Sequence, residues 1–327
     1  MIFEIDPCRA QKQAIKDAKI RFYGLTHGHY PGIKLPPEAL PGLKSLGFWD
    51  AVGTQDWRME PHRNDGLEIV LLETGGMDFA ADDELFQLAP GTLTVTCPWQ
   101  WHCHGTSRVG PGRLHWLILD VRALTLRERW QWPEWIVLQP ADLCALTESL
   151  RGDSRCVHSA GPELISAFQK ISAGLQAGQG AGFLSQVIVS VNQILLGLLG
   201  AIKAPRGIFQ VGGSLTERVI GRFFRELAMN GTRLAEPWTL ERMAGRCGVG
   251  CTMLVNYCKR LTNTTPMDYL NRCRLEWAAA ELVRRPAENI TGITYRAGFS
   301  SSAYFATQFK RRYGLTPREY RRRRLPR

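Results

Sequence analysis

Three side chains in the first third of the chain have the chemistry to hold a metal ion or a polar ligand. They are His62, Glu68 and His102. Imidazole nitrogens and a carboxylate suit a divalent ion, and three protein ligands that leave coordination positions open suit catalysis. The same groups can instead bind a small organic molecule, or one another. Both interpretations remain open on residue type alone.

A second group of side chains could form an aromatic-rimmed pocket that contains a cation. Trp99, Trp101 and Trp116 supply large amphipathic rings, and Arg63 supplies the cation. For each residue singly, packing in the core or at its rim is at least as good an explanation. The predicted ligand-binding set is His62, Arg63, Glu68, Trp99, Trp101, His102 and Trp116.

Strands are predicted to position these side chains. Between about residues 48 and 121, short apolar runs alternate with period two, as in Leu67, Ile69 and Leu71. Gly-Gly, Asp-Asp and Pro-Gly turns separate the runs, which favours an antiparallel barrel or jelly roll.

One amphipathic helix is predicted over residues 183–199. Its apolar face is predicted to hold Leu184, Val187, Ile188, Val191, Ile194, Leu195 and Leu198, with Gln186, Ser190 and Gln193 opposite. We expect it to be too polar and too short for a comfortable membrane span. This helix could pair two subunits or could pack on the barrel of its own subunit, and the sequence leaves both interpretations open. Residues 203–214 read as a linker.

The last third of the chain contains two segments of the same layout. Residues 239–261 and 289–313 each predict a short helix, a tight turn at Gly248 or Gly298, and a second helix. Helices joined by a short glycine-containing turn are typical of the helix-turn-helix motif.

The helical period predicts which faces of the second helices are buried. Leu254, Tyr257, Cys258 and Leu261 form one stripe, and Phe305, Phe309 and Tyr313 form the other. Residues away from these stripes would meet base edges or phosphates. The predicted DNA contacts are Thr252, Val255, Asn256, Lys259, Arg260, Ser302, Ala303, Thr307, Lys310, Arg311 and Arg318.

A connecting helix is predicted over residues 266–285, with Tyr269, Cys273, Trp277 and Ala280 as its buried stripe. At about 1.5 Å per residue it is a rod of about 30 Å. One turn of B-DNA is roughly 34 Å, so the rod could hold two recognition helices in successive major grooves.

Residues 214–327 resemble the AraC/XylS family of bacterial transcription regulators. The residues that match are Ala244, Gly248, Leu254, Pro266, Tyr269, Arg274, Leu275, Ala278, Ile293, Gly298, Phe299, Tyr304, Phe305, Phe309, Gly314, Pro317 and Tyr320. Three residues depart from the pattern. Cys258 replaces Phe, Thr294 replaces Ala, and Asn263 replaces Gly at a turn whose left-handed conformation Asn tolerates.

The segment from His62 to His102 resembles the cupin barrel that many members of this family carry as an effector domain. The similarity rests on His62-x5-Glu68-x6-Gly75 and on the run from Pro90 to His102. Asn64 stands where a second histidine is usual, so one expected metal ligand is missing. The resemblance implies a sensor barrel.

The positive charge is concentrated in the last third of the chain. Residues 214–327 carry 22 Lys and Arg against 9 Asp and Glu, while residues 1–160 carry 16 against 20. Such a basic domain fits phosphate binding. The nine cysteines contain no Cys-x-x-Cys pair, and no secretory signal is visible, so we expect a reducing cytoplasm.

Together these observations predict an α+β chain: a cupin-like effector domain (1–160), a helical dimerisation and linker region (161–213) and a DNA-binding domain (214–327). We predict a sequence-specific transcription regulator that is not an enzyme and needs no cofactor. Its expected partners are double-stranded DNA, a small-molecule effector and a second copy, with RNA polymerase as a candidate and no membrane. The alternatives are a metal-dependent cupin enzyme with an appended nucleic-acid-binding domain and a non-specific architectural protein.

Overall fold

The structure is a computed structural model that describes residues 8–53, 55–82, 84–106, 109–123, 129–152, 155–203, 215–229 and 231–324. It forms two compact units. The last helix of the N-terminal unit ends at Lys203 and the first helix of the C-terminal unit begins at Leu215. Residues 204–214, which contain most of the predicted linker and the predicted boundary at 213/214, lie outside the described residues.

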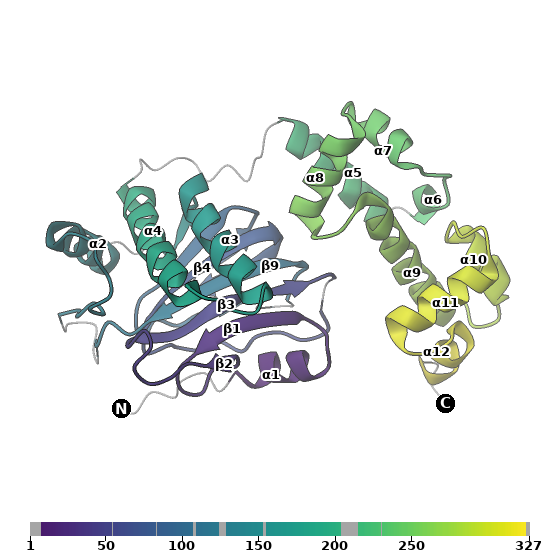
Figure 1. Cartoon of the computed structure of the whole chain (residues 1–327). Coiled ribbons are helices and arrows are strands. Elements are labelled where there is room, and N and C mark those ends of the chain that lie inside the picture. Colours follow the sequence, from purple (N-terminus) through teal and green to yellow (C-terminus); the bar gives the residue numbers. More distant parts are fainter. Residues whose placement is uncertain are drawn as a thin grey trace. The chain divides into compact units, whose positions relative to one another are not determined.

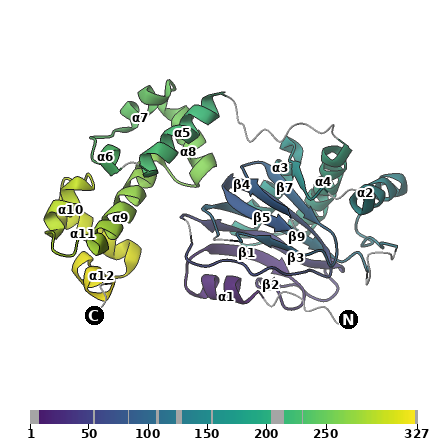
Figure 2. The ribbon, with the colours of Figure 1, turned by 180° about the vertical axis from the view of Figure 1, so that it is seen from behind.

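Two sheets form the N-terminal unit (Figures 1 and 2). The larger has the order β10-β7-β4-β9-β3-β1-β2 and the smaller has the order β6-β5-β8. The strands are β1 (Arg21–Thr26), β2 (Ile33–Lys34), β3 (Leu43–Ala51), β4 (Leu67–Gly75), β5 (Met77–Ala81), β6 (Glu84–Leu88), β7 (Thr92–Thr96), β8 (His102–His104), β9 (Gly112–Leu119) and β10 (Val157–Ser159). Pairing is antiparallel except between β1 and β2. The strands were predicted to begin near residue 48. That prediction was wrong, because β1 and β2 precede residue 48 and β3 contains it.

The central strands bury both of their faces. In β4, Ile69 and Leu71 pack toward the helices, whereas Val70 and Leu72 pack toward the space between the sheets. In β9, Leu117 lies on the helix side and Trp116 on the inner side. A strand that is covered on both faces reads as a nearly continuous apolar run. Glu68 interrupts that run, on the inner face of β4.

Helices cover the outer face of the larger sheet. They are α3 (Pro162–Gln176) and α4 (Phe183–Lys203); α2 (Pro140–Gly152) packs beside α4, and α1 (Arg9–Lys16) precedes β1. Figure 1 shows α3 and α4 in front of β4, β9 and β3, and Figure 2 shows them behind the sheet. Leu164, Phe168 and Ile171 of α3 join the core that Ile69 and Leu71 form.

The buried face of α4 packs within its own unit. Val187, Val191, Ile194 and Leu195 join the same core. Two positions differ from the predicted stripe: Leu184 is exposed and Ser190 is buried. Ser190 accepts a hydrogen bond from Gln186 Nε2 at 3.0 Å, so its hydroxyl oxygen has a partner where the helix buries it.

By length and composition, α4 could also cross a membrane, so the expectation that it is too short and too polar was wrong. Half of its most apolar window is buried inside the unit. The core helix of a folded domain can have the same length and composition.

The C-terminal unit contains the two predicted helix pairs. Its helices are α5 (Leu215–Met229), α6 (Gly231–Leu234), α7 (Leu240–Cys247), α8 (Cys251–Thr262), α9 (Pro266–Arg284), α10 (Ile290–Arg296), α11 (Ser302–Tyr313) and α12 (Pro317–Arg324). Side-chain caps begin α7, α9, α10 and α11, at Thr239, Thr265, Asn289 and Ser301. The turns at Gly248 and Gly298 have φ of 66° and 88°, and Asn263 adopts φ of 56°, as predicted.

The helix α9 joins the two helix pairs and is the core of this unit (Figure 1). Its buried side chains include Leu270, Cys273 and Leu282, so more than one face is covered. The predicted stripe was wrong at Ala280, which is exposed. A single amphipathic stripe does not describe a helix that packs against neighbours on several sides.

A buried arginine on α9 connects the end of α6 to the second helix pair. Arg274 donates from Nε to the carbonyl oxygen of Leu234 at 2.9 Å and from Nη2 to that of Glu236 at 3.1 Å. Its guanidinium also lies against the turn at Gly298, where an added Cβ would come within 2.7 Å of Arg274 Nε and 2.3 Å of the Leu234 oxygen. Arg274 therefore ties the end of α6 to the turn of the second pair.

We predict that Gly298→Ala destabilises the C-terminal unit by at least about 2 kcal/mol, because its φ is left-handed and a Cβ meets backbone. Gly245→Ala is the matched control, since Gly245 is a helical, exposed glycine with open space around it. It should be neutral or slightly stabilising. Urea unfolding measures both, and equal effects of the two changes would contradict the assignment.

A carboxylate holds α3 on the sheet. Glu73 on β4 accepts from His115 Nε2 at 2.6 Å and from Gln169 Nε2 of α3 at 2.7 Å. Burial by itself raises the pKa of Glu73, but the hydrogen bond and charge of His115 and the bond from Gln169 outweigh it, so the pKa lies below its usual value. The carboxylate therefore stabilises the fold most when it is ionised.

We predict that Glu73→Gln lowers the free energy of unfolding at pH 7 and that this difference from the wild type shrinks as the pH falls. The reason is that a depressed folded pKa contributes stability above the unfolded pKa, which is lost as the pH drops through the folded value. Urea titrations at pH 7 and near pH 4 measure it. Glu38→Gln, at an exposed loop carboxylate, is the control. A difference that stays constant with pH would refute the ionic role.

Candidate nucleic-acid interface and buried histidine cavity

A cavity of about 50 Å³ lies inside the N-terminal unit, on the inner face of the larger sheet. Trp49 comes from β3, Glu68 and Val70 from β4, and Trp116 from β9. Loop residues and one residue of the smaller sheet complete its lining: Tyr30, His62, Asn64 and His104 among others. The antiparallel register places Glu68 opposite Thr96 of β7, so the carboxylate points away from the helix-covered face.

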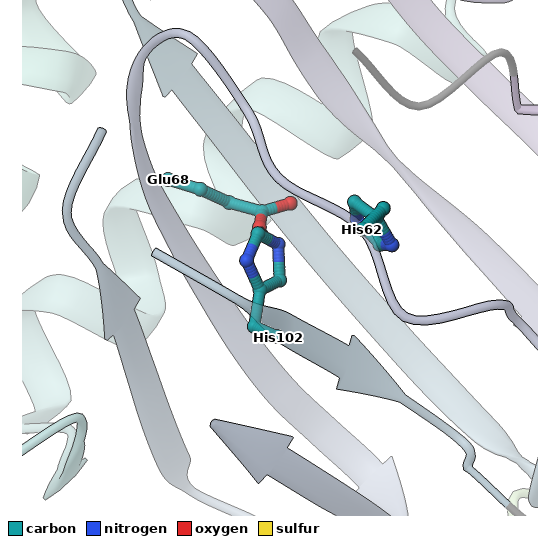
Figure 3. Close-up of side chains that lie close together, drawn as sticks. All are labelled: His62, Glu68 and His102. Carbon is teal, nitrogen blue, oxygen red and sulfur yellow. The ribbon is translucent and has the colours of Figure 1, made fainter. Parts of the chain in front are cut away.

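The backbone brings His62 and His102 side by side. The two residues exchange N–H to carbonyl hydrogen bonds of 3.0 Å in both directions. Their ring centroids are 4.4 Å apart. Figure 3 shows His62 on the loop before β4 and the His102 ring turned toward the Glu68 carboxylate. Residues 40 positions apart in the sequence thus form one site with Glu68.

Each of these rings is oriented by a backbone carbonyl. Nδ1 of His62 lies 2.8 Å from the oxygen of Glu60, and Nδ1 of His102 lies 2.9 Å from the oxygen of Gln100. A carbonyl only accepts, so Nδ1 carries a proton in both rings.

Glu68 is a buried, ionised carboxylate. Its Oε2 lies 2.6 Å from His102 Nε2, 3.2 Å from Asn64 Nδ2 and 3.4 Å from Thr96 Oγ1. Burial by itself raises the pKa of Glu68, but the charge and hydrogen bond of His102, helped by His104 and His62, hold it at about 2. Burial lowers the pKa of His104 to about 3, so that ring is neutral.

The predicted aromatic residues divide between two locations. Trp116 lines the cavity and donates from Nε1 to Ser45 Oγ at 2.9 Å. Trp99 donates instead to the carbonyl oxygen of Ala123 and is not among the lining residues. Trp101 is 45% exposed, with the Arg63 guanidinium 4.5 Å from its ring centroid. Arg63, Trp99 and Trp101 therefore do not form a shared pocket with Trp116.

Several cavity residues were missed from the sequence. Tyr30 lies in the first 45 residues, which show no clear pattern, and His104 is separated from His102 by one residue. The spacing of His102 and His104 on one strand was a usable signal, because residues two apart share a face. Asn64, treated as a lost ligand, donates to Glu68 and accepts from the Tyr30 hydroxyl at 3.2 Å.

The predicted DNA contacts lie on α8 and α11, except Arg318, which lies on α12. Leu254, Cys258, Phe305 and Phe309 are buried beneath them, as predicted. The exposed members are Thr252, Asn256, Lys259, Arg260, Ala303, Thr307, Lys310, Arg311 and Arg318, while Val255 and Ser302 are half-buried. Tyr304 and Met253, which were not predicted, are 48% and 47% exposed beside them.

The second of these helices is held on the rod. Arg312 of α11 pairs with Glu276 of α9 at 2.5 Å, and Phe305 and Phe309 join the core of Leu275, Ala278 and Leu282. Buried aromatic anchors and an ion pair fix one face of α11 and leave the opposite face in solvent. Rigid presentation of exposed side chains is what a recognition helix requires.

Two family models match the chain. A helix-turn-helix domain model covers residues 243–323, and a model of an AraC-like ligand binding domain covers residues 51–161. The first includes α8 and α11, the second helix of each pair. The second includes His62, Glu68, His102 and Trp116.

Curated proteins and solved structures give further matches. The chain is 38% identical over 87 residues to the HTH-type transcriptional activator RhaS of Escherichia fergusonii. That match spans 27% of this chain and 31% of the relative's length. The C-terminal domain of AraT, a response regulator from Geobacillus stearothermophilus, is 26% identical, with 35% of this chain and 92% of that chain covered and a TM-score of 0.31.

A longer alignment comes from ToxT of Vibrio cholerae in its unsaturated fatty acid bound form. It covers 84% of this chain and 94% of that one, with 12% identity and a TM-score of 0.27.

Proposed function

Since the chain belongs to the AraC family of transcriptional regulators, we propose that it binds promoter DNA through its C-terminal unit under the control of a ligand in its N-terminal unit. Both matched domains are those of a regulator, and AraC-family transcription factors are not enzymes. The chain matches about a third of the length of its curated relatives, so the activity of the whole protein is inferred from its own residues.

The observation that carries this proposal is the pair of exposed recognition faces on one rigid unit. Small polar side chains, Thr252 and Asn256 on α8 and Thr307 on α11, are accessible where base edges would lie. Lys259, Lys310 and Arg311 follow them at positions suited to phosphates. Phosphate contacts position a protein on DNA, and base contacts supply its sequence preference. The polar faces therefore favour a sequence-specific regulator over an architectural protein.

The length of α9 supports binding in two adjacent major grooves. It has 19 residues, or about 28 Å at 1.5 Å per residue. Successive major grooves on one side of B-DNA are roughly 34 Å apart. Helices that are attached near the two ends of this rod can reach both grooves on the same face of a duplex.

A homodimer and a contact with RNA polymerase complete the proposal. Val189 and Leu196 of α4 are 53% and 57% exposed and lie seven residues apart, so they share one helix face. That face is available to a second copy while the opposite face packs on the barrel. A regulator that binds a promoter acts beside RNA polymerase and in the compartment that holds the DNA, the cytoplasm of a bacterial cell.

We predict that Arg311→Ala weakens binding to all DNA sequences about equally and lowers the slope of log K against log salt by about 0.9. Lys170→Ala, which removes one exposed positive charge from the N-terminal unit, should leave the slope unchanged. Fluorescence anisotropy over a salt series measures both. Identical behaviour of the two variants would rule out a phosphate contact at Arg311.

Thr307→Arg tests the sequence-specific contact. On fragments selected from genomic DNA by the wild-type protein, we expect it to reduce the ratio of specific to non-specific affinity by about tenfold or more, since one lost base contact costs about 1–3 kcal/mol. Binding to random DNA should persist, because the added charge is positive. If the wild type itself binds selected and random fragments equally at every salt concentration, the proposed function fails.

A further inference from the structure

The last helix, α12, carries a cluster of positive charge that is separate from the outer faces of α8 and α11. Its exposed members are Arg318, Arg322, Arg323 and Arg324. We propose that this cluster is a sequence-independent contact site for the phosphate backbone of DNA, beside the groove that receives α11. Its place on the operator rests on the proposed function, whereas the cluster itself stands on the contacts of α12.

The exposed arginines of α12 have no carboxylate partners. Among the described residues, none of the four forms an ion pair. Other arginines of the C-terminal unit are paired. Arg222 and Arg233 share Glu226, and Arg312 of the neighbouring α11 pairs with Glu276. The positive charge of α12 is therefore available to an external anion.

The single carboxylate of α12 is already used within the helix. Oε2 of Glu319 accepts from the backbone N–H and from the hydroxyl of Thr316, both at 2.8 Å. The pKa of Glu319 lies below its usual value, first because of the backbone hydrogen bond from Thr316, and also because of the charges of Lys310 and Arg322. The start of α12 thus holds its carboxylate, and cations of α11 and α12 lie near the same point.

Helix stability does not account for the whole cluster. A cation in the last turn interacts favourably with the helix dipole, which suits Arg322, Arg323 and Arg324. Arg318 is in the first turn, where a positive charge opposes the dipole. Arg318 and Arg322 are also four residues apart, a spacing at which like charges destabilise a helix. Binding of an anion explains the arrangement better than folding does.

The helix α12 is fixed beside the last turn of α11 (Figure 1). The ring centroid of Tyr320 lies 5.3 Å from that of Phe309 and 5.1 Å from that of Tyr313. Lys310 and Arg311, at positions suited to phosphates, belong to that last turn. The cations of α12 therefore continue those of α11, and they can reach the backbone next to the same groove.

The composition of this surface favours a phosphate backbone over an acidic protein. Protein interfaces have apolar or aromatic anchors near their centre. In α12, Pro317 is buried and Tyr320 packs on α11, so neither is such an anchor. Guanidinium groups bind phosphate in a bidentate manner. Residues 318–324 span about 9 Å, and DNA carries one charge per about 1.7 Å of its axis, so the cluster faces about five phosphates.

The test is the salt dependence of DNA binding by the full-length chain. In a variant with Arg322→Gln and Arg323→Gln, we expect the slope of log K against log salt to fall by about 1.8, or about 0.9 for each lost phosphate contact. Random DNA and fragments selected by the wild type should show the same loss, so their affinity ratio stays unchanged. Hydroxyl-radical footprinting should lose protected backbone positions at one end of the site only.

Two further variants separate a phosphate contact from a change in folding or in total charge. Arg322→Lys with Arg323→Lys keeps both charges and should retain the wild-type slope. Arg222→Gln with Arg233→Gln removes the same charge from α5 and α6, where both side chains pair with Glu226, and should leave the slope unchanged. An equal fall of the slope in this control would assign the effect to net charge and overturn the proposal.

A wild-type slope and footprint in the α12 glutamine variant would also overturn the proposal, and would leave the cluster to an acidic protein surface. If the wild type distinguishes selected from random DNA while that variant behaves like the wild type, this proposal falls alone. If the wild type does not distinguish them, the proposed function fails, and a reduced slope on random DNA still supports the contact at α12.

Discussion

Burial of both faces of β4 and β9 is the constraint on which the N-terminal unit depends. Because helices cover one face of the sheet and the cavity lies against the other, these strands are almost wholly apolar. A charged group on the inner face must then be paired, since an unpaired buried carboxylate is expensive. Glu68 meets this requirement through His102, Asn64 and Thr96. On the inner face of β4, this paired carboxylate therefore stands beside the cavity.

In the C-terminal unit, the buried contacts hold the two helix pairs in a fixed relative position. The rod α9 supplies the separation, and Arg274 supplies a buried connection from the end of α6 to the turn at Gly298. Glycine is required at that turn because the backbone of Leu234 approaches too closely for a Cβ. Because the buried faces of α8 and α11 stabilise the unit, their outer faces can carry polar and cationic side chains.

Prediction from the sequence succeeded where one face of an element is buried and failed where burial is not one-sided. In the stripes of α8 and α11, Leu254, Cys258, Phe305 and Phe309 are buried as predicted, whereas Tyr257, Leu261 and Tyr313 are only half-buried. The stripes of α4 and α9 contained errors at Leu184, Ser190 and Ala280, because these helices contact several neighbours. Trp99 and Trp101 were grouped with Trp116 on residue type, but strand register and loop geometry separate them.

Local patterns alone were sufficient for the two helix-turn-helix motifs, the alternating strands and the concentration of positive charge, because each depends on neighbours within a few turns of chain. They also identified His62, Glu68 and His102 as candidate ligand-binding residues. Only the tertiary structure decided that their ligand atoms converge, that Tyr30 and Asn64 join them, and that a cavity of about 50 Å³ lies beside them. Those properties depend on how the loop before β4 and the smaller sheet close over the larger one, and side-chain direction across such distances is set by packing rather than by spacing.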